Sequence, residues 1–103
     1  MYTLKIFILA FLCAKTTISL NWNGNWAHGC DWIGNDFSNK RIRGEDCGPL
    51  CDRTPDCSHF TWNQWDNGTC WMKKGQIEKS DAIEVEDQSY VCGIRTTPLE
   101  TTE

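Results

Sequence analysis

Residues 57–73, with the sequence CSHFTWNQWDNGTCWMK, decide the fold of this chain. Two runs rich in threonine and aromatic residues, 57–62 and 69–73, lie on either side of the Asp-Asn-Gly sequence at 66–68. Threonine and large rings favour the pleated surface of a sheet, and Asn-Gly adopts the positive φ angles of a tight hairpin turn at little cost. The stretch therefore predicts a β-hairpin that turns at residues 66–68.

Upstream of this hairpin, residues 44–54 predict one short helix. Acidic residues open the segment, where they favour a helix N-terminus, and Pro55 follows its end. Cys47 and Cys51 are separated by one helical turn, so their side chains share a face of the helix. Pro49 leaves the length of the helix open, because a proline beyond the first turn costs about 3 kcal/mol.

The rest of the chain predicts short strands and loops. Residues 21–43 carry irregularly spaced apolar positions among Asn and Gly, a pattern typical of short strands and turns. Residues 75–88 are charged and predict a loop, whereas residues 89–94 predict a last strand. The Thr-rich, polar residues 96–103 predict a disordered tail or the start of a linker.

The first 19 residues predict a secretory signal peptide. An early cation, Lys5, precedes the apolar run 6–14, and small polar residues follow before a predicted cleavage after Ser19, placed to within a few residues. The apolar run is about half the length of the roughly 20 residues that span a bilayer, so we expect no permanent membrane anchor. Cys13 lies inside this leader, and we expect it to be absent from the mature protein.

Length and charge limit what the mature chain can be. Its 103 residues, less the leader, suffice for one small domain, placed here at residues 20–95, and exclude a multidomain enzyme. Without Lys5 and Lys15, eight basic groups oppose fourteen acidic ones, a net charge of −6. An acidic surface argues against nucleic acid as a partner, because phosphate binding requires basic residues.

Six cysteines remain after the leader, an even number in an exported chain, and they predict three disulfides. Cross-links worth about 2–4 kcal/mol each matter in a domain this small. The cysteine spacing lacks the repeated two-residue knuckle of a zinc site, so we expect no metal. Sequence alone allows fifteen pairings.

Helix geometry narrows these pairings. If Cys47 and Cys51 project from one helix face onto the sheet, each meets a strand cysteine more easily than it meets the other. The last pair would then fasten the first strand to the last and close the longest loop. The favoured pairs are Cys51–Cys57, Cys47–Cys70 and Cys30–Cys92.

Several motifs together resemble the PAN/Apple domain family. They are CGPLC at 47–51, CSHFTW at 57–62 and GTCWMK at 68–73, with a similar entry GCDW at 29–32 and exit YVCG at 90–93. The resemblance covers roughly residues 26–94. It implies a small disulfide-rich α+β fold in which a twisted antiparallel sheet packs on one short helix. It also implies helix–sheet disulfides and a terminal disulfide. Family members bind proteins or carbohydrates and catalyse nothing themselves, so the resemblance implies a binding module.

The sequence contains few residues in patterns that are typical of a catalytic site. Neither His28 nor His59 belongs to a recognisable nucleophile motif. Asp66 with a partner such as Asp31 could act on a glycoside, but a chain of this size rarely forms the deep cleft that the reaction needs. The acidic stretch 31–36 does not match the ligand spacing of a calcium loop. We therefore expect neither an enzyme nor a cofactor.

Six tryptophans in so short a chain are the unusual feature of the composition. Phe60, Trp62 and Trp71 belong to the motifs above, and we expect them to pack in the core. Trp65 flanks the predicted turn and Trp22 lies in a polar, Asn-rich segment. Exposed indoles stack on sugar rings and anchor protein interfaces, so these two are candidate contact residues, with plain packing as the alternative.

Two small basic clusters supply a further candidate site. Lys40, Arg41 and Arg43 precede the helix, and Lys73 and Lys74 follow the hairpin motif. If the clusters converge, they could hold a sulfated or acidic glycan. A solvated face is the alternative, which the overall acidity favours.

Asn67-Gly68-Thr69 is an N-glycosylation sequon on the predicted turn, and Asn67 is therefore a candidate glycosylation site. Taken together, the sequence predicts a secreted, extracellular and monomeric binding module that recognises carbohydrate through exposed aromatic residues. The alternative is a protein-interaction module directed at a protease or at a host or cell-surface protein. The expected partner is thus an extracellular glycan or protein.

Overall fold

The predicted hairpin forms the centre of a five-stranded antiparallel sheet. In the computed structural model, which describes residues 20–97, β4 (His59–Asn63) pairs with β5 (Thr69–Lys73). A short 3₁₀ turn, η1 (Trp65–Asn67), joins them, with positive φ at Asp66 (54°) and Asn67 (69°). These are the left-handed conformations that Asp and Asn tolerate, so the turn predicted from this sequence is confirmed.

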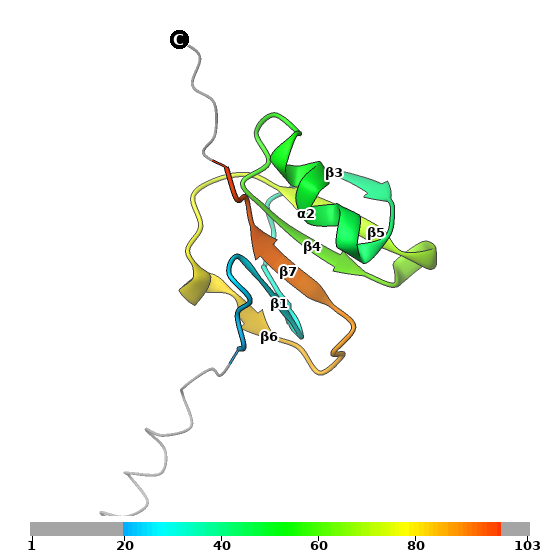
Figure 1. Ribbon diagram of the computed structural model, residues 1–103, viewed down its shortest axis with the longest axis vertical. Coiled ribbons are helices and arrows are strands. Elements are labelled where there is room, and N and C mark those ends of the chain that lie inside the picture. Colours follow the sequence, from blue (N-terminus) through cyan, green and yellow to red (C-terminus); the bar gives the residue numbers. More distant parts are fainter. Residues whose placement is uncertain (1–19, 98–103) are drawn as a thin grey trace, which may run out of the picture.

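The sheet has the strand order β1-β7-β4-β5-β3 (Figure 1). Its edge strands are β1 (Trp26–His28) and β3 (Asp36–Arg41), and β7 (Val91–Ile94) lies between β1 and β4. A second, two-stranded sheet joins β2 (Cys30–Asp31) to β6 (Ile83–Glu84), and η2 (Lys79–Asp81) precedes β6. The prediction of a plain loop over residues 75–88 was therefore wrong. The charged residues gave no strand signal. Strand β6 is short and exposed, and its pairing with β2 defines it.

Helix α2 (Gly44–Asp52) crosses one face of the large sheet, over β4 and β5 (Figure 1). It begins where the sequence predicts and ends two residues earlier. Pro49 lies inside the helix without breaking it. Disulfides at Cys47 and Cys51 attach the turns on either side of this proline to the rest of the domain.

The three disulfides join residues that are 62, 23 and 6 positions apart in the chain. Their pairs are those that helix geometry favoured: Cys30–Cys92, Cys47–Cys70 and Cys51–Cys57. The Cα atoms of each pair lie 5.3–5.5 Å apart, the ordinary separation for this bond. One disulfide ties β2 to β7, and the other two tie α2 to β5 and to the segment before β4. The molecule is thus a small, disulfide-rich α+β domain.

The sheet buries apolar side chains on both faces. On the helix side, the buried residues are Cys47, Leu50, Cys51, Cys57, Phe60, Cys70 and Met72. On the other side, they are Ala27, Cys30, Trp32, Ala82 and Cys92. Phe60 is buried as expected, but Trp62 and Trp71 are only half-buried. The fully enclosed tryptophan is Trp32, whose Nε1 donates to the Phe60 carbonyl at 3.0 Å and so satisfies the buried indole.

Arg95, the residue after β7, caps the helix C-terminus. The last turn of α2 has no basic residue of its own. The guanidinium donates to the carbonyls of Cys51, Asp52, Thr54 and Cys57 at 2.7–3.1 Å. It thereby places a positive charge at the negative end of the helix dipole and supplies a charged donor to carbonyls of the last turn and of the loop that follows.

Thr96 extends this attachment, since its backbone N–H donates to Asp52 at 2.9 Å. The predicted tail, 96–103, therefore begins with a residue that contacts the helix. The predicted leader 1–19, with Cys13 in it, and residues 98–103 lie outside the described residues.

Replacing Arg95 by alanine is expected to lower the free energy of unfolding by about 2 kcal/mol, because four carbonyls lose a charged donor. Arg95→Lys should recover only part of this loss, since an ammonium cannot reproduce the planar fork. Urea unfolding of the oxidised protein measures both. Arg53→Ala, which removes an exposed arginine at the same helix end, is the control and should change stability by less than about 0.5 kcal/mol. Equal effects of Arg95→Ala and Arg53→Ala would contradict the capping role.

Candidate functional site

A shallow hollow of about 530 Å³ lies at the hairpin end of the sheet, and aromatic side chains form part of its surface. We name it the aromatic platform. Its lining residues are Asn63, Gln64, Trp65, Trp71, Asp87 and Tyr90. Trp71 alternates along β5 with Cys70 and Met72, which face the helix, so its ring projects from the opposite face. The platform is therefore on the face that α2 does not cover.

Two indoles make up the centre of the platform. Trp65 in η1 is 60% exposed, the largest exposed fraction of any tryptophan in residues 20–97. Its ring lies against that of Trp71, with centroids 5.4 Å apart and planes at 50°. Trp65 was a candidate contact residue with plain packing as the alternative, and its ring is exposed, whereas Trp71, expected in the core, is only half-buried. The Trp65 ring therefore packs against Trp71 and leaves most of its surface exposed.

Asn63, the last residue of β4, bonds the indole of Trp71 and the backbone of Trp65. Its Oδ1 accepts from the Trp71 Nε1–H at 3.0 Å and from the Trp65 backbone N–H at 3.2 Å. Both partners are donors only, so the oxygen of the carboxamide must face them. The amide nitrogen of Asn63 therefore points away from these two N–H groups.

Asp87 places a negative charge beside the rings. Its Oδ1 accepts from the Ser89 hydroxyl at 2.7 Å and from the Ser89 backbone N–H at 2.9 Å. These two bonds, the hydroxyl first, lower the pKa of the Asp87 carboxyl below its ordinary value, so the group is ionised at neutral pH. Asp87 and Tyr90 come from a segment distant in sequence, and no local pattern indicated that they would meet Trp65.

Trp22, the second predicted contact residue, is a packing residue. It is half-buried, its ring lies 6.3 Å from that of Trp32, and the Lys79 ammonium lies 5.2 Å above it. It packs against the core on the face opposite the helix. The polar sequence around Trp22 suggested exposure, but the β2–β6 side of the domain provides an apolar surface that covers the ring.

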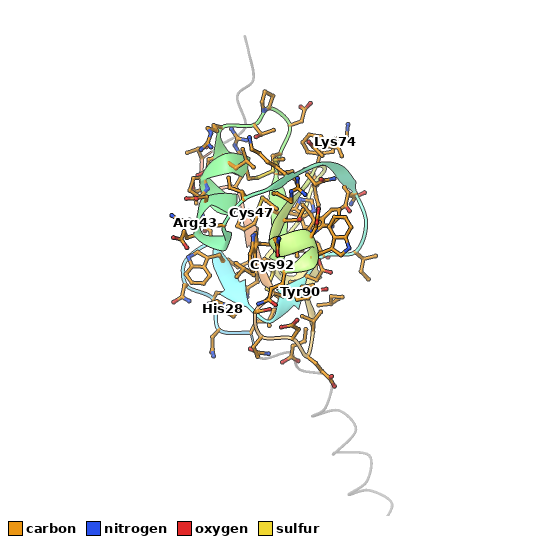
Figure 2. All side chains as sticks on the ribbon, turned by 90° about the vertical axis from the view of Figure 1, so that its right-hand side faces the viewer. His28, Arg43, Cys47, Lys74, Tyr90 and Cys92 are labelled. Carbon is orange, nitrogen blue, oxygen red and sulfur yellow. A yellow bond between two sulfur atoms is a disulfide. The ribbon has the colours of Figure 1, made fainter. Side chains whose placement is uncertain are left out.

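The predicted anion site at the basic clusters does not form. Lys73 is 4% exposed, and its ammonium pairs with Asp36 and donates to the Gly34 carbonyl. Arg43 and Lys74 lie on different sides of the molecule, so the two clusters do not converge (Figure 2). The prediction of Lys73 as a ligand contact was wrong, because the register of β5 turns this side chain inward beneath the loop that precedes β3.

The two predicted arginines are also paired with acidic side chains. Arg41 bonds Asp66 at 2.7 Å, an exposed pair that links β3 to the η1 turn. Arg43 lies 3.2 Å from Glu45 and 3.5 Å from Asp46, in the first turn of α2. Neither arginine lines the platform. The roles of Arg41 and Arg43 as glycan contacts are thus replaced by local ion pairing, and Arg41 supports the turn that carries Trp65.

The histidines and carboxylates considered for catalysis are not gathered into one site. Asp31 accepts from the Thr61 hydroxyl at 2.7 Å, whereas Asp66 pairs with Arg41. His28 is exposed beside Trp26, with ring centroids 5.3 Å apart. His59 is fully buried against Trp32, and burial, followed by the charge of Lys73, lowers its pKa from 6.5 to about 4.

A second hollow, the helix groove, has a volume of about 670 Å³ and lies between α2 and β1. It exists because the sheet is wider than its single helix (Figure 1). The rings of Phe60 and Trp62 border it, since Gly44 and Gly48 carry no side chain to cover them. A Cβ at these glycines would lie 3.3 Å from Trp62 and 3.4 Å from Phe60. Figure 2 shows His28 on the helix side of the molecule and Tyr90 on the other, so the groove and the platform occupy opposite faces.

Neither hollow has the ligands of a metal centre. Within residues 20–97, no three His, Cys, Asp or Glu side chains gather closely enough to hold a metal ion. In the same range no helix combines the length and the apolar character needed to cross a bilayer. Comparisons with protein-family models, with curated proteins and with solved structures give no match for the chain. The geometry and chemistry of the two hollows are therefore the features that indicate function.

The buried His59 makes stability depend on pH. The unfolded chain takes up a proton near pH 6.5, whereas the folded state resists it until about pH 4, so stability is complete above 6.5 and falls as the pH drops toward 4. The expected loss approaches about 3 kcal/mol at the lower limit. Urea unfolding at several pH values measures it. His59→Gln should flatten the slope in this window and His28→Gln should not. A slope unchanged by His59→Gln would contradict the assignment.

Proposed function

We propose that this chain is a secreted, non-catalytic binding module of the PAN/Apple type and that it recognises carbohydrate at the aromatic platform. The observation that carries the proposal is the exposed Trp65 ring, held against Trp71 and flanked by Asn63 and Asp87. Indole faces stack on the apolar C–H faces of pyranose rings, and polar groups at the edge bind hydroxyls. A shallow surface with both features suits a sugar better than a fully apolar ligand.

The architecture supports the PAN/Apple part of the proposal. One helix packs on an antiparallel sheet, two disulfides attach the helix, and a third joins the first strands to the last. This arrangement is what the resemblance of the cysteine and aromatic motifs implies. The resemblance further implies binding without catalysis, in line with carboxylates and histidines that each have separate partners or lie apart.

The predicted leader and the three disulfides support export, because such bonds persist in oxidising compartments. Asn67 lies exposed in the η1 turn, where a glycan could be attached. We therefore propose an extracellular monomer whose partner is a glycan, with Asn67 as a glycosylation site.

A second candidate function, protein interaction, is favoured by the helix groove. Trp26 is 39% exposed at its edge, beside the rings of Trp62 and Phe60. Carboxylates of Glu45 and Asp52 border the same hollow. An apolar side chain with a neighbouring cation, presented by a partner protein, would match this surface. Protein interfaces commonly use such aromatic anchors.

The test of the main proposal is Trp65→Ala. We expect at least a tenfold loss of affinity for the bound glycan, because the stacking surface is removed, with little change in melting temperature since the ring is mostly exposed. A glycan array with an insoluble-polysaccharide pull-down identifies the ligand, and calorimetric titration measures the affinity. Trp26→Ala, which removes an exposed tryptophan from the other face, is the matched control.

Unchanged glycan affinity in Trp65→Ala would remove the platform from the site. If no glycan is retained, and one protein from secretions binds the wild type and Trp65→Ala but not Trp26→Ala, the second candidate function replaces the first.

A further inference from the structure

We propose that the aromatic platform selects uncharged sugars that carry adjacent free hydroxyls, with Asn63 as the hydrogen-bond donor and Asp87 as the acceptor, and that it discriminates against sulfated and carboxylated glycans. This inference rests on the proposed function of the platform. It adds the chemical class of the ligand and assigns specificity to two residues that the sequence analysis did not single out.

The donor is the amide group of Asn63. Its carboxamide oxygen is occupied by the two N–H groups of Trp65 and Trp71. The carboxamide cannot flip, because the amide would then face two donors and neither tryptophan N–H would have an acceptor. No residue in the described part of the chain accepts a hydrogen bond from this amide, which therefore remains available to a ligand at the rim of the rings.

The acceptor is the second carboxylate oxygen of Asp87. Ser89 occupies Oδ1 with two hydrogen bonds and leaves Oδ2 without a partner among residues 20–97. The same two bonds hold the carboxylate in one orientation. An ionised carboxylate accepts hydrogen bonds and donates none, whereas the Asn63 amide donates and accepts none. Adjacent sugar hydroxyls, each able to donate and accept, can satisfy both groups at once.

The negative charge of Asp87 disfavours the binding of acidic glycans at the platform. Asp87 is the one charged side chain among the described residues that line the platform. No lysine or arginine is among the described residues that line the platform, and Arg41 and Lys73 are paired with Asp66 and Asp36. A sulfate or uronate would therefore meet an uncompensated carboxylate next to the stacking surface. Such like-charge contact is a common source of discrimination between related ligands.

Two isosteric variants separate recognition from folding. Asp87→Asn keeps an oxygen that can accept the Ser89 bonds, and it replaces the charged acceptor Oδ2 with an amide that only donates. Asn63→Asp keeps an oxygen for the two tryptophan N–H groups, and it replaces the amide donor with a negatively charged acceptor. Glu86→Gln removes a charge from the exposed neighbour of Asp87 and serves as the control. Melting temperatures of all three should stay close to that of the wild type.

The experiment titrates the full oxidised chain and its variants with chitotetraose, cellotetraose and a heparin tetrasaccharide. We expect wild-type binding to at least one neutral oligosaccharide, at least tenfold tighter than to the heparin fragment. Asp87→Asn and Asn63→Asp should each weaken the neutral complex about tenfold, as expected for a lost charged or directed hydrogen bond, and Glu86→Gln should leave it unchanged.

The inference is overturned if the heparin fragment binds as tightly as the neutral sugars, or if Asp87→Asn and Asn63→Asp bind like the wild type. Either result, with sugar binding still lost in Trp65→Ala, would leave the proposed function intact and reject only the assigned specificity. If none of the three sugars binds, the selectivity is rejected with them, and the glycan array then decides the proposed function separately.

Discussion

Cys47 and Cys51, one turn apart on α2, are bonded to Cys70 on β5 and to Cys57 before β4. A nine-residue helix with a proline inside it has little stability of its own, because isolated helices shorter than about 12–15 residues are marginal in water. Its position is set instead by these two covalent attachments, by the apolar side chains beneath it and by the Arg95 cap. The position of α2 over β4 and β5 in turn decides which parts of the sheet it leaves uncovered.

Because α2 covers only part of one face of the sheet, the rest of the sheet is covered by other elements or stays exposed. At the β1–β7 side, the helix face stays open as the groove, with three glycines, Gly44, Gly48 and Gly93, next to its aromatic rings. On the opposite face, the Cys30–Cys92 disulfide and Trp32 enclose a second core. The hairpin end of that face has no covering element, and there Trp71 and Trp65 remain accessible as the aromatic platform.

The chemistry of the surface follows from how the few cations are used. Lys73 neutralises Asp36, Arg41 supports the η1 turn through Asp66, and Arg95 serves the helix terminus. These pairings leave an acidic domain with no basic surface at either hollow. The surface that results combines indole rings, one directed amide and one free carboxylate oxygen. Those features agree better with an uncharged, hydroxyl-rich ligand than with an anionic one.

Residue patterns along the chain were enough to predict the local elements. The hairpin, its turn at Asp66 and Asn67, the short helix and the favoured cysteine pairs all follow from backbone propensity and from spacing along the chain. Exposure was predictable for Trp65, which flanks a turn. Only the tertiary structure decided that Lys73 and Trp22 are covered, that Trp71 faces away from the core, and that Asp87 meets the hairpin. Those outcomes depend on strand register and on contacts between distant segments, which fix the environment of a side chain and leave no local pattern in sequence.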